Sequence, residues 1–328
     1  MRYVRTPPAF RRETDRVTDS EPDAITLRNG RSTLTVHPNV AMIATSLMLD
    51  NTEFLTMPRT LAQYRDGSCT GMPLLHPWAN RLEHCRYPQP VNERPTDNES
   101  FVEFDPNSVH LDANGLAIHG TIRTQPFVVQ ARTANAITAN FDFACHPELL
   151  ASFPFPHEIA ISYELVASGV EHRCEITTAV RNTGATPMPI SFGWHPFFAL
   201  PSRPRSAWRL RTPACQRHEL TELLLPTGIT FAQPEIDDVI GERTYDDHFA
   251  LTDDRIFVIS DDQHSIIVEF DDGYQHLQIY LPGADGLLPG DFVCIEPMTA
   301  PTNALVAQTA PLLSPAATYT AAFSITLT

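Results

Sequence analysis

Residues 256–281 contain three strand-like runs in series: Ile256-Phe257-Val258-Ile259, then Ile266-Ile267-Val268-Glu269-Phe270, then His276 to Leu281. The first two are separated by a turn at Asp261-Asp262, and the second and third by a turn at Asp271-Asp272-Gly273. Short runs rich in β-branched and aromatic residues, bounded by turn residues, are typical of strands. The stretch therefore predicts an antiparallel meander.

The same pattern recurs in other parts of the chain. Residues 159–166 (IAISYELV) and 172–180 (HRCEITTAV), joined at Ser168-Gly169, predict a hairpin. Helical periodicity is hard to find in any longer window, and 29 scattered prolines argue against a helical bundle. We therefore expect an all-β protein, a large antiparallel β-sandwich of two packed sheets with long loops around a concave site.

The organisation along the chain is simple. Residues 1–23 are polar and charged and include Pro7-Pro8, so we expect a flexible N-terminal arm. The remainder contains no Gly-Ser linker, repeat or low-complexity block. We therefore expect residues 24–328 to form a single domain.

Composition limits the class of partner. A formal net charge of -16 argues against binding nucleic acid or an anionic membrane surface, because both require clustered Lys and Arg. The chain has no apolar run of signal-peptide or transmembrane length, and its six cysteines are widely spaced with no C-x-x-C pair. These features predict a soluble, cytoplasmic protein with reduced thiols and a neutral small-molecule partner.

Glu296 is the most informative single residue. It follows the apolar run Phe292-Val293-Cys294-Ile295 and precedes Pro297. A carboxylate in apolar surroundings is costly, and burial raises its pKa toward the range useful to a general base. The alternative from the local pattern is a glutamate that merely ends an edge strand where proline stops the ladder.

Three further clusters combine aromatic and polar residues. Asn80 and Arg81 follow Trp78, His119 precedes Gly120, and His195 stands among aromatic residues in Ser191-Phe192-Gly193-Trp194-His195-Pro196-Phe197-Phe198. Aromatic faces with directional Arg and Asn donors suit a sugar. Each residue also has a structural alternative: a surface ion pair for Arg81, and a hydrogen-bonded core imidazole for either histidine unless a carboxylate such as Glu296 or Asp246 is close.

Six motifs in order resemble the aldose 1-epimerase (galactose mutarotase) family. They are the stretches Gly71 to Arg81, His119 to Arg123, Gly193 to Phe198, Asp246 to Phe249, Gln278 to Tyr280 and Glu296 to Pro301. The resemblance covers almost all of the expected domain. It implies the supersandwich form of the β-sandwich and interconversion of the α and β anomers of a free aldose.

The resemblance also implies a role for each matching residue. Glu296 would be the base that takes the proton from the anomeric hydroxyl, and His195 the acid that protonates the ring oxygen. The substrate-binding residues would be Asn80, Arg81, His119, Asp246 and Gln278. No metal or other cofactor is expected, and the chain lacks H-E-x-x-H, P-loop and G-x-S-x-G motifs. We expect a monomer or homodimer.

The chain departs from the family pattern at three positions. Phe197 replaces the usual Tyr, and Phe127 replaces the usual Trp. Trp194 is bulkier than the usual residue and could narrow the pocket or add a stacking face. The sugar-binding aspartate is Asp246 or its neighbour Asp247, with the spacing to Phe249 favouring Asp246. These departures bear on which sugar is bound.

Two alternatives to a mutarotase remain. One is an epimerase of a phosphorylated hexose on the same fold, with Arg81, Arg86 and Arg123 as candidates to bind the phosphate. The other is a non-catalytic sugar-binding or regulatory protein. A glycosidase is disfavoured because it needs two carboxylates flanking the bond, and Asp246 is better explained by hydroxyl binding.

Overall fold

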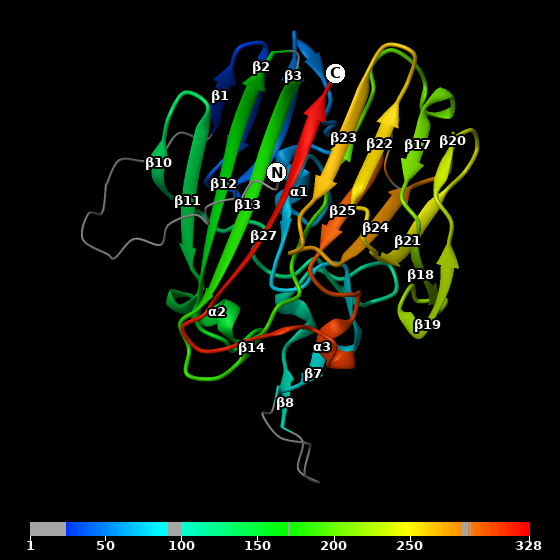
Figure 1. Cartoon of the computed structure of the whole chain (residues 1–328). Coiled ribbons are helices and arrows are strands. Elements are labelled where there is room, and N and C mark those ends of the chain that lie inside the picture. Colours follow the sequence, from blue (N-terminus) through cyan, green and yellow to red (C-terminus); the bar gives the residue numbers. More distant parts are fainter. Residues whose placement is uncertain (1–23, 91–99, 170, 284–287, 289) are drawn as a thin grey trace.

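The computed structural model describes residues 24–90, 100–169, 171–283, 288 and 290–328 (Figure 1). The expected N-terminal arm, residues 1–23, lies outside the described residues. Strands dominate the described part, and its α-helices are α1 (Leu61–Arg65), α2 (Pro147–Leu150) and α3 (Ala304–Ala307). None of these helices combines the length and apolar character needed to span a membrane. The expected all-β class is confirmed.

One layer of the molecule is a nine-stranded antiparallel sheet that crosses the front of Figure 1. Its strands, in spatial order, are β10 (Val128–Arg132), β11 (Ala136–Asp142), β12 (His157–Ser168), β13 (Glu171–Asn182), β27 (Thr318–Leu327), β23 (Ser265–Phe270), β22 (Ile256–Ser260), β17 (Arg209–Thr212) and β20 (Ile236–Val239). The predicted hairpin is the β12–β13 pair, in continuous register from His157↔Asn182 to Ser168↔Glu171.

The second layer contains two sheets. A four-stranded sheet comprises β1 (Ile25–Asn29), β2 (Ser32–His37), β3 (Ile43–Leu49) and β4 (Thr52–Glu53). An eight-stranded sheet comprises β19 (Pro226–Gln233), β18 (Cys215–Leu220), β21 (Tyr245–Ala250), β24 (His276–Leu281), β25 (Val293–Met298), β15 (Gly193–Trp194) and β5 (Leu74–Leu75), with β16 (Phe197–Phe198) also paired to β25. Three two-stranded pairs complete the list: β6 (Arg81–Leu82) with β9 (Ala117–Ile118), β7 (Arg86–Pro88) with β8 (Phe101–Glu103), and β14 (Met188–Pro189) with β26 (Leu312–Leu313).

The two layers enclose an apolar core. Tyr163 of β12 donates a hydrogen bond to the carbonyl of Met42 beside the four-stranded sheet. Trp194 of β15 contacts the ring of Phe323 on β27 and donates to Thr178 of β13. These cross-layer contacts make the molecule a β-sandwich, as expected.

The predicted meander is only partly right. The β22–β23 pair is antiparallel as predicted, but β23 has β27 as its other neighbour. β24 leaves this sheet and pairs with β21 and β25 in the opposite layer. The turn at residues 271–275 thus carries the chain from one sheet to the other, because β27 already occupies the free edge of β23.

Candidate active site

The centre of the eight-stranded sheet has an apolar face and a polar face. Gln278 of β24 lies directly opposite Glu296 of β25, and the next pair in the ladder is Ile279 opposite Ile295. Since successive side chains alternate across a sheet, the isoleucines pack in the core while Gln278 and Glu296 share the other face. The sequence places a carboxylate at 296 and an amide at 278, and only the register makes them neighbours.

Glu296 does not end an edge strand. β25 continues through Pro297, which is opposite Leu277, and it is flanked by β24 on one side and by β15 and β16 on the other. The Glu296 residue is 2% exposed. The structural alternative of a terminal glutamate is therefore wrong.

His195 enters the same space from the short connection between β15 and β16. Its backbone N–H donates to the Pro73 carbonyl at 3.1 Å, which fixes the segment. Its Nε2 lies 3.3 Å from Oε1 of Glu296, and its ring stacks on Phe197 with centroids 4.6 Å apart and planes 13° from parallel. His195 thus has the carboxylate partner that a catalytic imidazole requires.

A second wall comes from β6 and β9, which pair through Arg81 and Ile118. Asn80 (φ 58°) and His119 (φ 64°) flank this pair in left-handed backbone conformations, and the His119 N–H donates to the Asn80 carbonyl at 2.9 Å. The His119 ring stands perpendicular to that of His195, with centroids 5.3 Å apart. The tight β6–β9 pair therefore presents an amide, a guanidinium and an imidazole together.

Arg81 organises the polar groups between the two walls. Its Nε donates to Asp112 at 2.8 Å, its Nη1 donates to Oδ1 of Asn80 at 3.1 Å, and its Nη2 lies 3.7 Å from Asp246. Gln278 donates to Asp246 at 2.7 Å, which links both walls. Arg81 is therefore not in a solvent-exposed ion pair but at the centre of a partly buried network.

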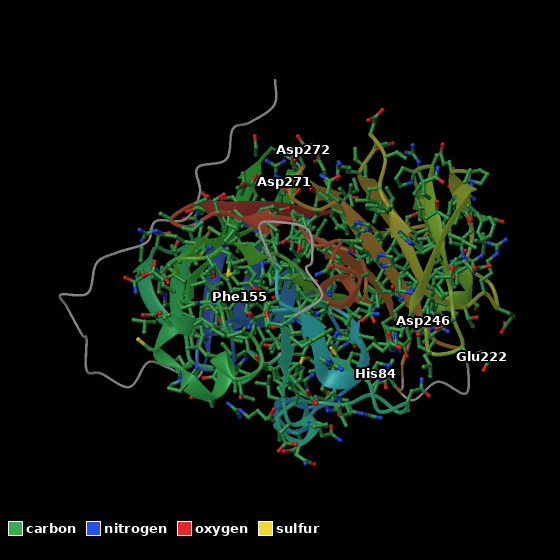
Figure 2. All side chains as sticks on the ribbon, turned by 90° about the horizontal axis from the view of Figure 1, so that it is seen from below. His84, Phe155, Glu222, Asp246, Asp271 and Asp272 are labelled. Atoms are coloured by element: carbon green, nitrogen blue, oxygen red, sulfur yellow. The ribbon has the colours of Figure 1, made fainter. Side chains whose placement is uncertain are left out.

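The structure separates the two adjacent aspartates. Asp246 is opposite Tyr280 and shares the polar face with Gln278, whereas Asp247 is opposite Ile279 and forms an ion pair with Arg217 at 2.6 Å. Figure 2 labels Asp246 on the strands of the eight-stranded sheet, far from the turn that carries Asp271 and Asp272. Only Asp246 faces the other candidate residues.

All seven predicted site residues line one cavity of about 430 Å³. This volume lies within the range of about 300–1,000 Å³ usual for small-molecule sites. Among the described residues, Nδ1 of His119, Nδ1 of His195 and Oε2 of Glu296 are buried without a hydrogen-bond partner. Such orphaned atoms are costly unless a ligand satisfies them.

Burial dominates the electrostatics of Glu296 and His195. It raises the pKa of Glu296 well above its usual range, and the Asp246 carboxylate raises it further while Arg81 lowers it. Burial lowers the pKa of His195 to about 3. Burial thus favours the uncharged form of both groups.

Burial also favours the uncharged forms of the two flanking groups, Asp246 and His119. It raises the pKa of Asp246, although Arg81 and the hydrogen bond from Gln278 oppose the shift. Burial also lowers the pKa of His119 well below its usual value, with the neighbouring His195 contributing. His119 is thus a neutral imidazole, able to donate through one nitrogen and accept through the other.

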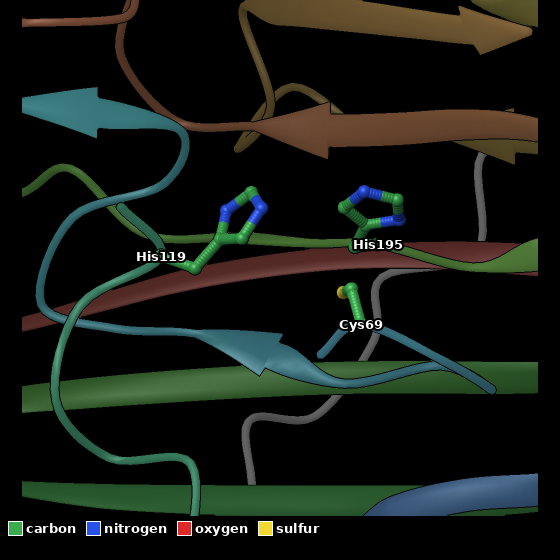
Figure 3. A group of neighbouring side chains, drawn as sticks. All are labelled: Cys69, His119 and His195. Atoms are coloured by element: carbon green, nitrogen blue, oxygen red, sulfur yellow. The ribbon is translucent and has the colours of Figure 1, made fainter. Parts of the chain in front are cut away.

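Several cavity residues were missed by the sequence reasoning, chiefly Cys69, Asp112 and Tyr280. Asp112 had a local signal, because Asp112-Ala113-Asn114-Gly115 is a turn sequence immediately before the predicted His119 motif. Cys69 had none, since it comes from a loop more than a hundred residues from His195. Figure 3 shows its side chain beside the rings of His119 and His195.

Two groups at or beside the cavity have the composition of metal ligands. They are Cys69 with His119 and His195, and Cys294 with His195 and Glu296. Burial raises the pKa of Cys69 to about 12 and that of Cys294 well above its usual value, so both are thiols at neutral pH. A metal at either group would have to displace the thiol proton and would compete for the side chain of His195.

The three departures from the family pattern lie behind the cavity. Phe127 stacks on Phe141 in the core, and the buried Trp194 indole donates to Thr178. Neither side chain lines the cavity, so Trp194 offers no stacking face to a ligand there. Phe197 is the departure that contacts the site, through its stack on His195.

Comparison with solved structures finds the same fold. A galactose mutarotase-like protein from Clostridium acetobutylicum has a TM-score of 0.77 at 20% identity, covering 93% of this chain and 95% of that one. An aldose epimerase homologue from C. elegans has a TM-score of 0.72 at 14% identity (93% and 98% covered). Galactose 1-epimerase from Lactobacillus acidophilus NCFM has a TM-score of 0.69 at 14% identity (95% and 97% covered). At these identities the likeness shows the fold alone.

Sequence comparison identifies the family. No curated protein gives a significant match to the chain. The family model for aldose 1-epimerase, however, matches residues 23–326, almost the whole length. This confirms the resemblance carried by the six motifs, and the chain belongs to the aldose 1-epimerase family.

Proposed function

We propose that this protein is an aldose 1-epimerase that interconverts the α and β anomers of a free aldose by general acid–base catalysis. The observation that carries the proposal is the buried pair of Glu296 and His195, 3.3 Å apart in one cavity with five hydrogen-bonding residues. Mutarotation requires only a proton acceptor and a proton donor on opposite sides of the hemiacetal. The pair supplies both.

Glu296 and His195 alone can carry out the proton transfers of ring opening and reclosure. Glu296 takes the proton from O1 while His195 gives a proton to O5, so that the C1–O5 bond breaks and C1=O1 forms. Rotation about C1–C2 then presents the other face of the aldehyde, and O5 attacks C1 as the protons return. The protein is regenerated without any other reactant.

The sugar itself prepares the pair for this reaction. Burial favours a neutral Glu296 carboxyl and a neutral His195 imidazole, and transfer of a proton from the first to the second gives a carboxylate and an imidazolium of the same total charge. A hydroxyl that donates to the carboxylate and a ring oxygen that accepts from the imidazolium both favour the ionised form. Substrate binding thereby favours the ionised pair that catalysis needs.

The remaining five residues hold the ring. Arg81 and Asn80 donate, Asp246 accepts, and Gln278 and His119 do both, so each meets a hydroxyl in a fixed direction. The existing Arg81–Asp246 and Gln278–Asp246 contacts keep these groups in place before the sugar arrives. Their contribution is orientation.

The charge distribution favours a neutral sugar over a phosphorylated one. Arg81 already faces the carboxylates of Asp112 and Asp246. Arg123 donates to the carbonyls of Tyr64 and Ser68, and Arg86 stacks on Phe101. All three arginines considered for a phosphate are thus engaged within the protein, and two carboxylates would repel the dianion.

Polarimetry tests the proposal. Freshly dissolved α-D-glucose, α-D-galactose and α-anomers of pentoses should equilibrate faster with the protein than in buffer, and Glu296→Gln should slow this by about 10²–10⁴-fold. Glucose 6-phosphate should be a poorer substrate than glucose. If no sugar is accelerated while calorimetry detects sugar binding, the protein is a sugar-binding protein and the enzymatic proposal fails.

A further inference from the structure

A second cluster of histidines lies on the eight-stranded sheet outside the catalytic cavity. His218 is on β18, His248 on β21 and His276 on β24, three strands that are neighbours in the sheet. The register pairs Arg217 with Phe249 and Ala250 with His276. The three imidazoles therefore come from segments far apart in sequence and are brought together only by strand pairing.

The ring nitrogens of this cluster converge. One nitrogen from each histidine lies within 4.8 Å of the other two, and Nε2 of His248 is 3.3 Å from Nδ1 of His276. The rings of His248 and His276 are close to parallel, at 14°, and the His218 ring centroid is 4.8 Å from that of His248. None of the three lines the catalytic cavity.

Apart from the hydrogen bond between His248 and His276, much of the hydrogen-bonding capacity of the cluster is unused. Within the described residues, both nitrogens of His218 and Nδ1 of His248 are buried without a partner, and His248 is completely buried. Buried polar atoms of native proteins are normally satisfied. The two unsatisfied nitrogens of His218 indicate that this ring, the third of the cluster, is open to a ligand.

The protonation state suits a cation as that ligand. Burial lowers the pKa of His218, lowers that of His248 well below its usual value with the other two rings contributing, and lowers that of His276 to about 4. All three rings are therefore neutral at neutral pH, with a lone pair available on each. Neutral imidazole is the form that binds metals.

We propose that His218, His248 and His276 form a site for one divalent transition-metal ion of the Zn²⁺ class, with water completing the coordination. Imidazole nitrogen selects such ions over Mg²⁺ and Ca²⁺, which prefer oxygen. With Zn–N bonds of about 2.0–2.1 Å, tetrahedral ligands lie about 3.4 Å apart. Nε2 of His248 and Nδ1 of His276 are 3.3 Å apart, which is close to this value. His218 makes no hydrogen bond through its ring to the described residues, so it loses none if the ring moves to become the third ligand.

The proposed metal site lies next to two residues of the catalytic cavity. His248 lies opposite Gln278 in the β21–β24 ladder, and Asp246 is two residues before His248 on the same face. A metal bound across β18, β21 and β24 would fix the strands that carry Asp246 and Gln278. We expect it to stabilise the protein and to have little effect on the chemistry of Glu296 and His195.

The test is a titration of the full chain, without a polyhistidine tag, with Co²⁺ and Zn²⁺. The native protein should bind one equivalent of Co²⁺ with visible bands of a nitrogen- and oxygen-ligated ion and no thiolate-to-cobalt charge-transfer band. His218→Gln and His276→Gln should each weaken binding by at least about 10-fold, a loss usual even for outer-shell changes. Zn²⁺ should raise the midpoint of thermal unfolding of the native protein and not of these variants.

Cys69→Ser is the matched control, because Cys69 belongs to the alternative metal-binding group in the catalytic cavity. Its cobalt spectrum and affinity should equal those of the native protein. The proposal is overturned if the native protein binds no cobalt at micromolar concentration, or if binding survives both histidine substitutions and is lost in Cys69→Ser. Circular dichroism of each metal-free variant checks that it folds.

Discussion

Asp246 and Asp247 show that a shift of one residue along a strand changes the face of the sheet on which a side chain lies. They are identical in chemistry and adjacent in sequence, yet one lies beside Gln278 and Arg81 and the other pairs with Arg217. Because side chains alternate across a strand, a choice between neighbours is a choice between faces. The spacing argument from sequence favoured Asp246, and the geometry now supplies a physical basis for proposing it as the sugar ligand.

Substituting each of these two aspartates in turn gives a prediction and its control. Asp246→Asn should lower kcat/KM for the accepted sugar by about 10- to 100-fold, the value of a hydrogen bond to a charged group. Asp247→Asn should leave kcat/KM nearly unchanged, because only the ion pair to Arg217 is lost. Initial rates by polarimetry decide, and equal losses in both variants would contradict the assignment.

At the scale of elements, the short β6–β9 pair is what brings Asn80, Arg81 and His119 to the cavity. Gly120 makes the close approach possible. Its φ is +67°, and a Cβ at this position would lie 2.1 Å from the backbone oxygen of His76. No side chain other than hydrogen fits, so His119 is held in place by a contact that only glycine permits.

Substitution of Gly120 should therefore damage the site through the backbone. Gly120→Ala should destabilise the protein by about 3 kcal/mol or more and abolish most activity, since backbone atoms must move. Gly115→Ala is the control, because Gly115 also has positive φ (+79°) but has nothing within 4 Å of its Cβ position. It should cost only about 1 kcal/mol. Urea unfolding measures both, and equal costs would show that backbone conformation alone, not the close contact, matters.

The local sequence pattern predicts where the strands lie but not which strands pair. The runs at residues 256–260, 265–270 and 276–281 are strands with nearly the predicted ends. Their partners were not predictable, because the alternation of β24 is equally compatible with pairing to β23 and with crossing to the facing sheet. β24 crosses, and this crossing is what brings Gln278 opposite Glu296.

At the scale of the whole molecule, burial favours the neutral form of histidines in several parts of the described structure. Burial lowers the pKa of His76, His119, His157, His195, His248 and His276. A group whose folded pKa is below its unfolded pKa of about 6.5 contributes stability that is complete above that pH and is lost as pH falls. Glu296 and Asp246, with raised pKa values, act in the opposite direction but are fewer.

We therefore expect stability to fall on mild acidification. Between about pH 6.5 and pH 5 the free energy of unfolding should drop by several kcal/mol, because each fully shifted histidine contributes up to about 1.4 kcal/mol per pH unit. The midpoint of urea unfolding, measured without metal, reports the change. His276→Gln should reduce the slope, because one histidine with a lowered pKa is removed. A midpoint that rises on acidification would contradict the prediction.

The sequence by itself determined the strand class, the sandwich architecture, the family and a set of seven residues that share one cavity. It could do so because strand alternation and turn residues are local, and because family motifs keep their order along the chain. The tertiary structure decided the rest: β24 beside β25, Asp246 facing the cavity, Asp112 paired to Arg81, and three histidines gathered from three strands. These depend on register and on which sheet a strand joins, and both are set by contacts between residues distant in sequence.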